Sequence, residues 1–359
     1  MQTVRIDDLE IHARWLRDHG DDAGSVHPET GQRQVDTFAI PVDIAATAVR
    51  VDATVAEIDW SDGATTTHGI DRLRDVASRP RRPRMHDAPA FTLDPALRVW
   101  STPPDRIDRF DASVVVDDDA WRDALAHLHM FGWVAFDGAE RGSGAVEALA
   151  ARIGYPRPTF FGTLWEMAAG ATEHADSAYA PVPLDVHTDG TYLHDAPGTI
   201  IFSQQEKGGD GGDSVLVDGF AAARELQERE PEAATLLMRY EVRGRYLEPG
   251  VHVQADRPPL RTDPDGVLRQ VSFNNYDRAP VLPIPERIDD VIEAYAMFRS
   301  IMNEPQRALR LPWEPGRMLI MDNWRMLHGR TDYTGSRVFL GCYTNHEDLE
   351  SAFRLAGLG

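Results

Sequence analysis

The sequence predicts a mainly β protein, in which a closed or sandwiched β-core carries helices on its outside and a small β-rich unit precedes it. Two observations support this fold class. Beyond about residue 110, two or three amphipathic helices are accompanied by many short apolar runs typical of strands. Residues 1 to about 75 instead carry short alternating segments separated by Asp and Gly turns. A chain of 359 residues can form one large domain or two smaller ones.

The N-terminal part is expected to form strands over residues 37–45 and 49–60, where apolar and polar residues alternate. Residues 78–111 are rich in Pro, Arg and Asp and lack a sustained period. The basic run inside that segment is interrupted by prolines, which favours a solvated linker over a polyanion site. We therefore expect a small N-terminal domain over 1–100 and the main domain over 101–359.

Three helices are predicted in the main domain. The segment 117–132 begins with acidic residues and ends at Gly132, which can provide a left-handed stop. The segment 143–154 has inward-facing apolar residues at helical spacing, with Ser143 as its expected N-cap. The third helix is expected over 286–303, where apolar residues again recur at helical spacing.

The runs typical of strands share short length and apolar, β-branched or aromatic content: 133–136, 199–205, 213–220, 268–275, 317–323 and 337–345. The last of them contains Cys342, the one cysteine of the chain. A single cysteine excludes an intramolecular disulfide and a cysteine-cluster metal site. Its place in a buried strand also disfavours a role as a nucleophile.

The charge and hydropathy of the chain disfavour nucleic acid and membranes as binding partners. With 58 acidic and 37 basic residues the formal net charge is −21, so the overall field repels nucleic acid and anionic membrane. The N-terminus has no apolar signal-peptide core, and no stretch approaches the roughly 18 uncharged apolar residues of a membrane span. We expect a cytoplasmic protein that acts on a small molecule.

One set of polar residues indicates chemistry. His187 and Asp189 form one of four His-x-Asp triplets in the chain, so the pattern by itself is weak. His328 follows a predicted strand, with Arg330 and Arg337 soon after it. Two imidazoles and one carboxylate on one face of a metal leave three coordination positions open, as in non-haem Fe(II) oxygenases. An arginine nearby offers a bidentate fork to the carboxylate of a keto acid. The residues alone also allow either histidine to be structural.

Longer motifs carry a family resemblance. Five of them occur in this order: "GTLWEM", "AYAPVPLDVHTDGTY", "GGDSVLVDGF", "FNNYDRAP" and "MDNWRMLHGRTDYTGSRVFLGCYTN". Together they resemble the Fe(II)/2-oxoglutarate dioxygenases of the taurine-dioxygenase superfamily, in the branch of trimethyllysine and γ-butyrobetaine dioxygenases. "WLRDH" and "DWSDG" extend the likeness to the N-terminal domain. The resemblance implies a double-stranded β-helix (jelly-roll) core and an enzyme that uses Fe(II), 2-oxoglutarate and O2.

The resemblance also implies roles at the iron end of the site. His187, Asp189 and His328 would hold Fe(II), the alternative being a loop His-Asp pair and a core histidine. Asp189 further implies hydroxylation, since related halogenases carry a small residue there.

Three more residues fall on the family's cosubstrate positions. Arg337 would pair with one carboxylate of 2-oxoglutarate, Arg330 would support that end, and the hydroxyl of Ser214 would contact the cosubstrate. The alternatives are surface ion pairs for the arginines and a turn residue at 214.

The resemblance implies a substrate site with two ends. An aromatic cage for a trimethylammonium group would attract a cation through ring faces, and polar groups would bind the carboxylate end. The residues concerned are Trp165, Tyr179, Phe161, Tyr192, Asp176, Asn274 and Asn275. Two positions depart from the family: Phe161 replaces a tyrosine and Ser272 replaces an arginine. Both lie on the substrate side. The alternatives are therefore that the aromatic residues only pack the core, or that the enzyme acts on another substrate.

A third departure concerns zinc. The family's N-terminal domain binds zinc through cysteines and a histidine, but the cysteine positions here read Gly20, Ser25 and Ala64. Without thiolates we predict no structural zinc. The domain would then be stabilised by its own packing or by a partner subunit, as in a homodimer.

The expected activity is hydroxylation of an unactivated C–H bond, with C3 of a trimethyllysine-like amino acid as the first candidate. The same chemistry on γ-butyrobetaine, another betaine or amino acid, or a specialised-metabolite intermediate is the first alternative. A zinc hydrolase with the same three ligands and a non-catalytic small-molecule sensor are alternatives of other classes. The hydrolase leaves Arg330 and Arg337 without a role.

Overall fold

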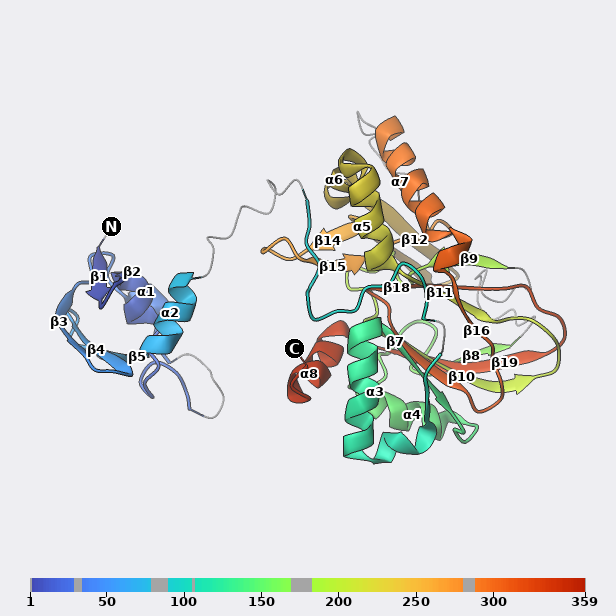
Figure 1. The fold of residues 1–359 in the computed structure, drawn as a ribbon, viewed down its shortest axis with the longest axis horizontal. Helices are drawn as coiled ribbons and strands as arrows, with labels where there is room; N and C mark the ends of the chain where they lie inside the picture. The colour runs from blue at the N-terminus through green and yellow to red at the C-terminus, as the bar shows by residue number, and fades with distance from the viewer. Residues whose placement is uncertain are drawn as a thin grey trace. The chain divides into compact units, whose positions relative to one another are not determined.

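The computed structural model describes residues 2–28, 34–78, 90–104, 107–168, 183–279 and 288–358. By its contacts the chain divides into two compact units, Met1–Arg82 and Pro83–Gly359 (Figure 1). This division precedes the predicted boundary after residue 100. The reason is that Phe91 and Trp100 are buried in hydrophobic clusters of the second unit.

The first unit contains a three-stranded antiparallel sheet of β3 (Ala46–Val51), β4 (Val55–Trp60) and β5 (Thr65–Gly69). A hairpin of β1 (Thr3–Ile6) and β2 (Leu9–His12) and the helices α1 (Ala13–Asp18) and α2 (Ile70–Ser78) complete it. Apolar residues of these elements share one small core that includes Ile6, Leu16, Ile58, Trp60 and Leu73.

The strand predicted over 37–45 is wrong, whereas the β3–β4 hairpin follows the pattern predicted over 49–60. Thr37–Ala39 forms a 3-10 turn, and Ala46 is the first residue of β3. Pro41 has no N–H to donate to a strand ladder, and Ile40 and Ile44 are both buried without the alternation of a strand.

The second unit contains two mainly antiparallel sheets. The larger one has the order β6 (Arg109–Asp111), β7 (Trp133–Asp137), β17 (Met318–Asp322), β10 (Thr199–Lys207), β19 (Arg337–Thr344) and β8 (Trp165–Ala168). The smaller one has the order β16 (Leu309–Leu311), β11 (Ser214–Asp218), β18 (Met326–Arg330) and β9 (Leu184–His187).

The inner faces of these two sheets pack on each other. One hydrophobic cluster contains Ile200 and Phe202 of the larger sheet together with Leu216 and Met326 of the smaller sheet. Because side chains alternate along a strand, Ile201 of β10 points to the opposite, outer face and belongs to another cluster. Two facing, mainly antiparallel sheets with a shared core match the sandwiched β-core that the sequence predicts and are the arrangement of the jelly roll that the resemblance implies.

Helices cover the outer faces. The helices α3 (Asp118–Phe131), α4 (Ser143–Ala151) and α8 (His346–Leu355) pack on the larger sheet. The helices α5 (Gly219–Arg229), α6 (Pro231–Arg239) and α7 (Ile288–Met302) share a cluster with the smaller sheet (Figure 1). The unit also contains two hairpins, β12 (Val242–Glu248) with β13 (Val251–Arg257) and β14 (Leu260–Thr262) with β15 (Leu268–Val271).

The predicted helix 117–132 is confirmed: Asp117 caps α3, and Gly132 ends it with φ +82°. The prediction of Ser143 as N-cap is wrong, because Gly142 takes that position and Ser143 is the first helical residue. The third predicted helix is confirmed as α7.

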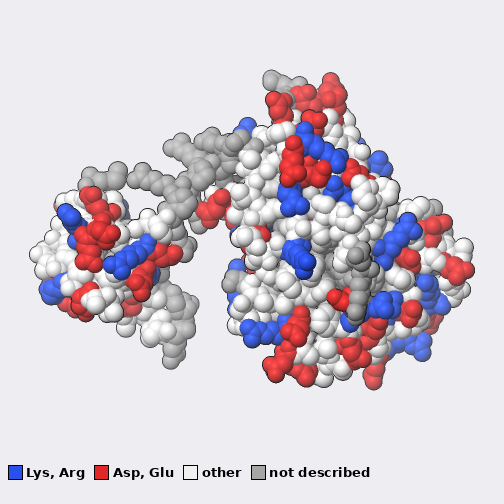
Figure 2. Space-filling view, in the orientation of Figure 1, with Lys and Arg blue, Asp and Glu red and all other residues white. Residues whose placement is uncertain are grey.

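Acidic and basic side chains are interspersed over the face seen in Figure 2. Within the described residues, none of the helices combines the length and apolar character that crossing a membrane requires.

Candidate active site

The pairing of β9 with β18 brings two histidines together. His187 and His328 are direct cross-strand partners in this antiparallel pair. Cross-strand partners project from the same face of a sheet, so their imidazoles become neighbours with ring centroids 4.5 Å apart. Residues separated by more than a hundred positions in sequence therefore meet through sheet register.

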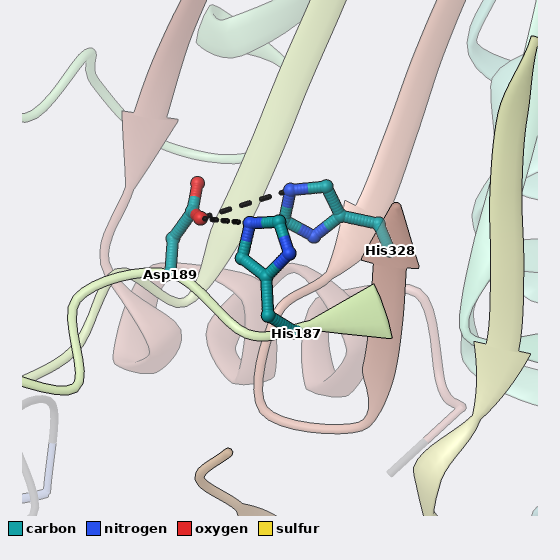
Figure 3. A group of neighbouring side chains, drawn as sticks. All are labelled: His187, Asp189 and His328. Carbon is teal, nitrogen blue, oxygen red and sulfur yellow. Dashed lines mark ion pairs between the residues drawn. The ribbon is translucent and has the colours of Figure 1, made fainter. Parts of the chain in front are cut away.

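Asp189 completes a cluster of three. It lies in the turn after β9, and its Oδ1 is 3.4 Å from Nε2 of His187 and 3.7 Å from Nε2 of His328 (Figure 3). One ligand atom from each of the three residues lies within 4.8 Å of the others. Within the described ranges, this is the one group of three or more His, Cys, Asp or Glu residues with such convergence.

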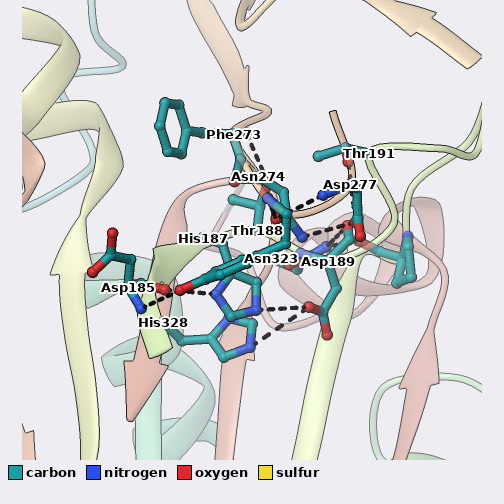
Figure 4. Close-up of polar contacts among 12 residues, drawn as sticks. Asp185, His187, Thr188, Asp189, Thr191, Phe273, Asn274, Asp277, Asn323 and His328 are labelled. Carbon is teal, nitrogen blue, oxygen red and sulfur yellow. Dashed lines mark hydrogen bonds and ion pairs between the residues drawn. The ribbon is translucent and has the colours of Figure 1, made fainter. Parts of the chain in front are cut away.

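The turn that carries Asp189 is held at its backbone (Figure 4). The N–H of Asp189 donates to Oδ1 of Asn323 at 2.9 Å, and the amide of Asn323 donates to the carbonyl of Asp189 at 3.0 Å. Asn323 is 1% exposed, so these bonds are shielded from water. Gly190 follows with φ +73°, a conformation that favours glycine, and a Cβ there would lie 2.5 Å from Pro197. These contacts fix where the carboxylate points.

The protonation of the cluster suits metal binding. Nδ1 of His187 lies 2.9 Å from the carbonyl oxygen of Asp185, so its hydrogen donates there and Nε2 keeps a free lone pair. Burial lowers the pKa of His328 to about 4, which keeps it neutral. Burial alone would raise the pKa of Asp189, but His328, His187 and Tyr343 lower it to about 2. Burial also lowers the pKa of His187, yet its hydrogen bond with Asp189 and the charge of that carboxylate raise it overall. Without a metal, Nε2 of His187 therefore tends to hold a proton, which a bound metal would displace to give the neutral ligand.

Two neutral imidazole nitrogens and one carboxylate oxygen form a donor set that fits Fe(II) with positions left open. Nδ1 of His328 is buried and has no hydrogen-bond partner among the described residues. Its Nε2 faces the carboxylate, as does that of His187. The residues present therefore fit a metal.

One cavity joins this cluster to most of the other predicted site residues. The predicted residues among those that line it are Phe161, Trp165, His187, Asp189, Tyr192, Ser214, Asn274, His328, Arg330 and Arg337. Asn275 does not line it and is exposed. Asp176 and Tyr179 lie outside the described residues.

Arg337 begins β19 and places a guanidinium against the cavity. Its Nε and Nη1 atoms are buried and have no hydrogen-bond partner among the described residues. The guanidinium carbon lies 5.2 Å from the ring of Tyr333 and 4.2 Å from that of Phe339. Burial, with the nearby charge of Arg330, lowers the pKa of Arg337 to about 10, so it is still a cation at neutral pH. A buried cation with unmatched donors suits an anionic ligand.

Ser214 lies beside this arginine end. It is the cross-strand partner of Arg330, which places the two side chains on the same face of the smaller sheet. The indole N–H of Trp313 donates to Oγ of Ser214 at 2.9 Å. That bond uses a lone pair of the hydroxyl and leaves its hydrogen for another acceptor.

Aromatic side chains form the other walls of the cavity. Trp165 packs on Phe202 with ring centroids 5.4 Å apart and on Tyr343 at 5.5 Å. Tyr192 and Phe161 both contact Tyr246, at 5.4 and 5.5 Å. These rings pack on one another and also line the cavity, so the same residues can support the fold and contact a ligand.

Asn274 lines the cavity, but its amide also stabilises a turn. Its Nδ2 donates to Asp277 at 2.8 Å, and its Oδ1 accepts from the N–H of Tyr276 at 2.9 Å. Asp277, a second carboxylate of the cavity wall, also accepts from Thr191 (Figure 4).

Sequence reasoning missed Asn323, Tyr343, Trp313 and Asp277. Asn323 and Tyr343 lie inside a quoted motif, and Asp277 lies inside another, so position near a motif was the signal that could have singled them out. Trp313, in "LPWEPG", had no such signal.

Comparisons with known proteins agree with this site. A family model described as "Taurine catabolism dioxygenase TauD, TfdA family" matches residues 97–343. The mitochondrial trimethyllysine dioxygenase of Gallus gallus is 31% identical over 353 residues, which cover 96% of this chain and 82% of that protein. The γ-butyrobetaine dioxygenase of Pseudomonas sp. (strain AK-1) is 29% identical over 354 residues, covering 95% and 89%.

Among solved structures, a putative alpha-ketoglutarate-dependent taurine dioxygenase from Burkholderia xenovorans is similar with a TM-score of 0.49 and 16% identity, covering 68% of this chain and 87% of that one. The family model spans more than half of the chain, and the named relatives are dioxygenases. These matches do not favour a hydrolase or a non-catalytic sensor. The chain belongs to the TauD/TfdA dioxygenase family and is an enzyme dependent on Fe(II), 2-oxoglutarate and O2.

Proposed function

We propose that this enzyme hydroxylates an unactivated C–H bond of a small trimethylammonium amino acid, with C3 of trimethyllysine as the first candidate. One observation carries the proposal: the His-Asp-His cluster, a buried arginine and a group of aromatic rings line the same cavity. The names of the relatives support the substrate class, since they are trimethyllysine and γ-butyrobetaine dioxygenases.

At the metal end, we assign His187, Asp189 and His328 as the ligands of Fe(II). With 2-oxoglutarate and O2, the bound iron supplies the oxidation that converts C–H to C–OH, while 2-oxoglutarate becomes succinate and CO2. The protein's part is to place the ligands. Asp185 holds the tautomer of His187, and Asn323 holds the backbone of Asp189.

At the cosubstrate end, Arg337 is the proposed partner of the far carboxylate of 2-oxoglutarate. The support is its two buried nitrogens without a partner among the described residues. Arg330 adds positive charge, and Ser214 has a hydroxyl hydrogen to donate. Together they would orient the cosubstrate toward the metal end and keep it there.

At the substrate end, Trp165, Phe161 and Tyr192 are the proposed ring faces for the trimethylammonium group. Tyr179 and Asp176 stay predictions for the same cage. Asn274 is the amide that we assign near the substrate's carboxylate, in preference to the exposed Asn275. Holding both ends of a flexible substrate would present one C–H bond to the metal.

A single assay series tests the reaction. We expect trimethyllysine to stimulate succinate formation from 2-oxoglutarate in air, with a hydroxylated product of matching amount. Substitution of His187 or Asp189 by Ala should abolish the stimulated turnover. Turnover that persists in either variant, or activity without O2 and 2-oxoglutarate, would contradict the proposal.

The substrate itself is tested by a panel of trimethyllysine, γ-butyrobetaine, other betaines and lysine. The γ-butyrobetaine dioxygenase among the relatives favours γ-butyrobetaine as the second candidate, and the departure from the branch at Phe161, which lines the cavity, is the reason to include other betaines. A preference for lysine over both quaternary amines would contradict the cage and leave the oxygenase chemistry intact.

We also propose that the first unit holds no structural zinc. Ser25 donates to Asp22 at 3.1 Å, and Asp22 accepts from the N–H of Gly24 at 3.0 Å, so hydrogen bonds tie the loop where the family has cysteines. Metal analysis of the purified protein should find no zinc retained after dialysis. A cytoplasmic location and a homodimer are further proposals, which cell fractionation and light scattering would test.

A further inference from the structure

The two oxygens of Asp189 have different partners. Oδ1 faces Nε2 of His187 at 3.4 Å and Nε2 of His328 at 3.7 Å. Oδ2 accepts a hydrogen bond from the hydroxyl of Tyr343 at 2.9 Å. In Figure 3 this second oxygen points away from both imidazole rings. The carboxylate is therefore divided between a metal-facing oxygen and an oxygen bound by the protein.

Tyr343 is well placed to hold that oxygen. It lies in β19, the strand that begins with Arg337, and its backbone pairs with Ile200 of β10 in the middle of the larger sheet. Its carbonyl also accepts from the N–H of Arg157 at 2.7 Å. Pairing with β10 and the bond from Arg157 limit how far the strand can move at Tyr343.

Alternate residues of β19 face the cavity together. Arg337, Phe339 and Tyr343 all line it, spaced by multiples of two along the strand. Gly341 lies between the last two, and a Cβ there would be 2.1 Å from the ring of Trp165. The missing side chain lets Trp165 lie against the strand, 5.5 Å from the ring of Tyr343.

The division of the carboxylate matters for coordination. A carboxylate with two unengaged oxygens can bind a metal through both and occupy an additional position. Oxygenase chemistry on a two-histidine, one-carboxylate site needs its other positions open for cosubstrate and O2. Hydrogen bonds to a ligating carboxylate set its orientation and commonly change metal affinity or activity by about 10–100-fold.

We propose that Tyr343 is a positioning residue, whose hydroxyl holds Oδ2 of Asp189 so that the carboxylate meets the metal through Oδ1 alone. This inference rests on the proposed role of Asp189 as a metal ligand. It adds a residue that acts through Asp189, on the strand that also supplies the cosubstrate arginine.

The test uses Tyr343→Phe, which removes the hydroxyl and keeps the ring that packs on Trp165. The metal-free enzyme is titrated anaerobically with Co(II) as a redox-inert probe, and its visible absorption reports coordination. We expect the Kd for Co(II) to rise about tenfold or more and the absorption of the bound ion to change. Tyr155→Phe is the matched control, since Tyr155 is 71% exposed and outside the cavity; it should match the wild type in both.

The outcomes separate this inference from the proposed function. If Asp189→Ala binds Co(II) as tightly as the wild type, the metal assignment itself is wrong. If Asp189→Ala loses binding while Tyr343→Phe keeps both the wild-type affinity and spectrum, the positioning role alone is overturned. Thermal unfolding of the metal-free proteins checks that each variant folds, and Tyr343→Leu is the second variant should the phenylalanine form fail.

Discussion

Two arginines of the second unit differ in what surrounds their guanidinium groups. Arg325 is 1% exposed and donates to Asp218 at 2.7 Å. It also donates to three backbone carbonyls, those of Arg98, His129 and Met130. Arg337 has buried Nε and Nη1 atoms with no acceptor among the described residues, and it faces the cavity of the His-Asp-His cluster.

The difference separates a structural cation from one arranged for a ligand. Folding rarely leaves a buried donor unmatched, because the lost hydration is not replaced. One unmatched atom is weak evidence, since Nε of Arg325 and Nδ1 of His68 also have no partner among the described residues. Unmatched donors that line the same cavity as a group of metal-type ligands are strong evidence for a ligand-binding site.

Arg325→Ala should have the largest effect on stability. It leaves the buried carboxylate of Asp218 without its counter-ion, and breaking a buried pair in this way costs about 3–5 kcal/mol of unfolding free energy. Urea unfolding would measure it. The control is Arg229→Ala, whose side chain is 48% exposed in its ion pairs and should cost at most about 1 kcal/mol. Equal losses in the two variants would contradict the structural role of Arg325.

Arg337→Ala should do the opposite, with little change in stability and a large loss of cosubstrate binding. Charge-assisted hydrogen bonds are worth about 1.5–3 kcal/mol, so the Kd for 2-oxoglutarate should rise about 10–150-fold. Anaerobic titration of the Fe(II) enzyme would measure it. Arg337→Lys keeps the charge without the fork and should recover only part of the affinity. A destabilised protein with normal 2-oxoglutarate affinity would make Arg337 a structural residue like Arg325.

The same distinction explains what the sequence could predict. The triad and Arg337 could be found because their residue types and motif order are chemically unusual. Asn323 and Trp313 form hydrogen bonds with partners that the fold brings close, Asp189 and Ser214, and nothing in their local sequence specifies those partners. Tyr343 is similar: the pattern predicted a strand there, but not that its hydroxyl reaches Asp189.

The helices, too, could be predicted only in part from the sequence. The helix α3 could be predicted with its ends, because Asp117 and Gly132 supply local start and stop signals. The helices α5 and α6 were missed although Pro231 and Glu232 begin α6 in the usual way. Phe220 and the alanines after it are buried almost all round, so α5 shows a weak amphipathic pattern. Its helical state depends on the tertiary cluster around it.

His68 of the first unit is a buried histidine whose Nδ1 has no hydrogen-bond partner among the described residues, and its charge should make stability depend on pH. It is fully buried, Thr66 lies 3.0 Å from its Nε2, and burial lowers its pKa to about 4. Between pH 6.5 and 4 the unfolded chain holds a proton that the folded chain does not, so stability falls as pH falls. At about 1.4 kcal/mol per pH unit, this one group should cost roughly 2 kcal/mol between pH 7 and 5. Urea unfolding of His68→Gln should show a correspondingly smaller loss, and an unchanged pH dependence would exclude His68 as the cause.

Trp313→Phe should have the smallest effect, because a ring stays in the cavity wall and only the hydrogen bond to Ser214 is lost. Removing the indole N–H frees the hydroxyl of Ser214 to turn away, and a neutral hydrogen bond is worth about 0.5–1.5 kcal/mol. The Kd for 2-oxoglutarate should therefore rise about 2–10-fold, with kcat nearly unchanged at saturating cosubstrate. Ser214→Ala removes the same contact directly, so the double variant should be no weaker than Ser214→Ala alone. Fully additive losses would instead mean that Trp313 affects the site by packing on Phe339, whose ring lies 4.8 Å from its own, and the cosubstrate end would then depend on shape more than on matched donors.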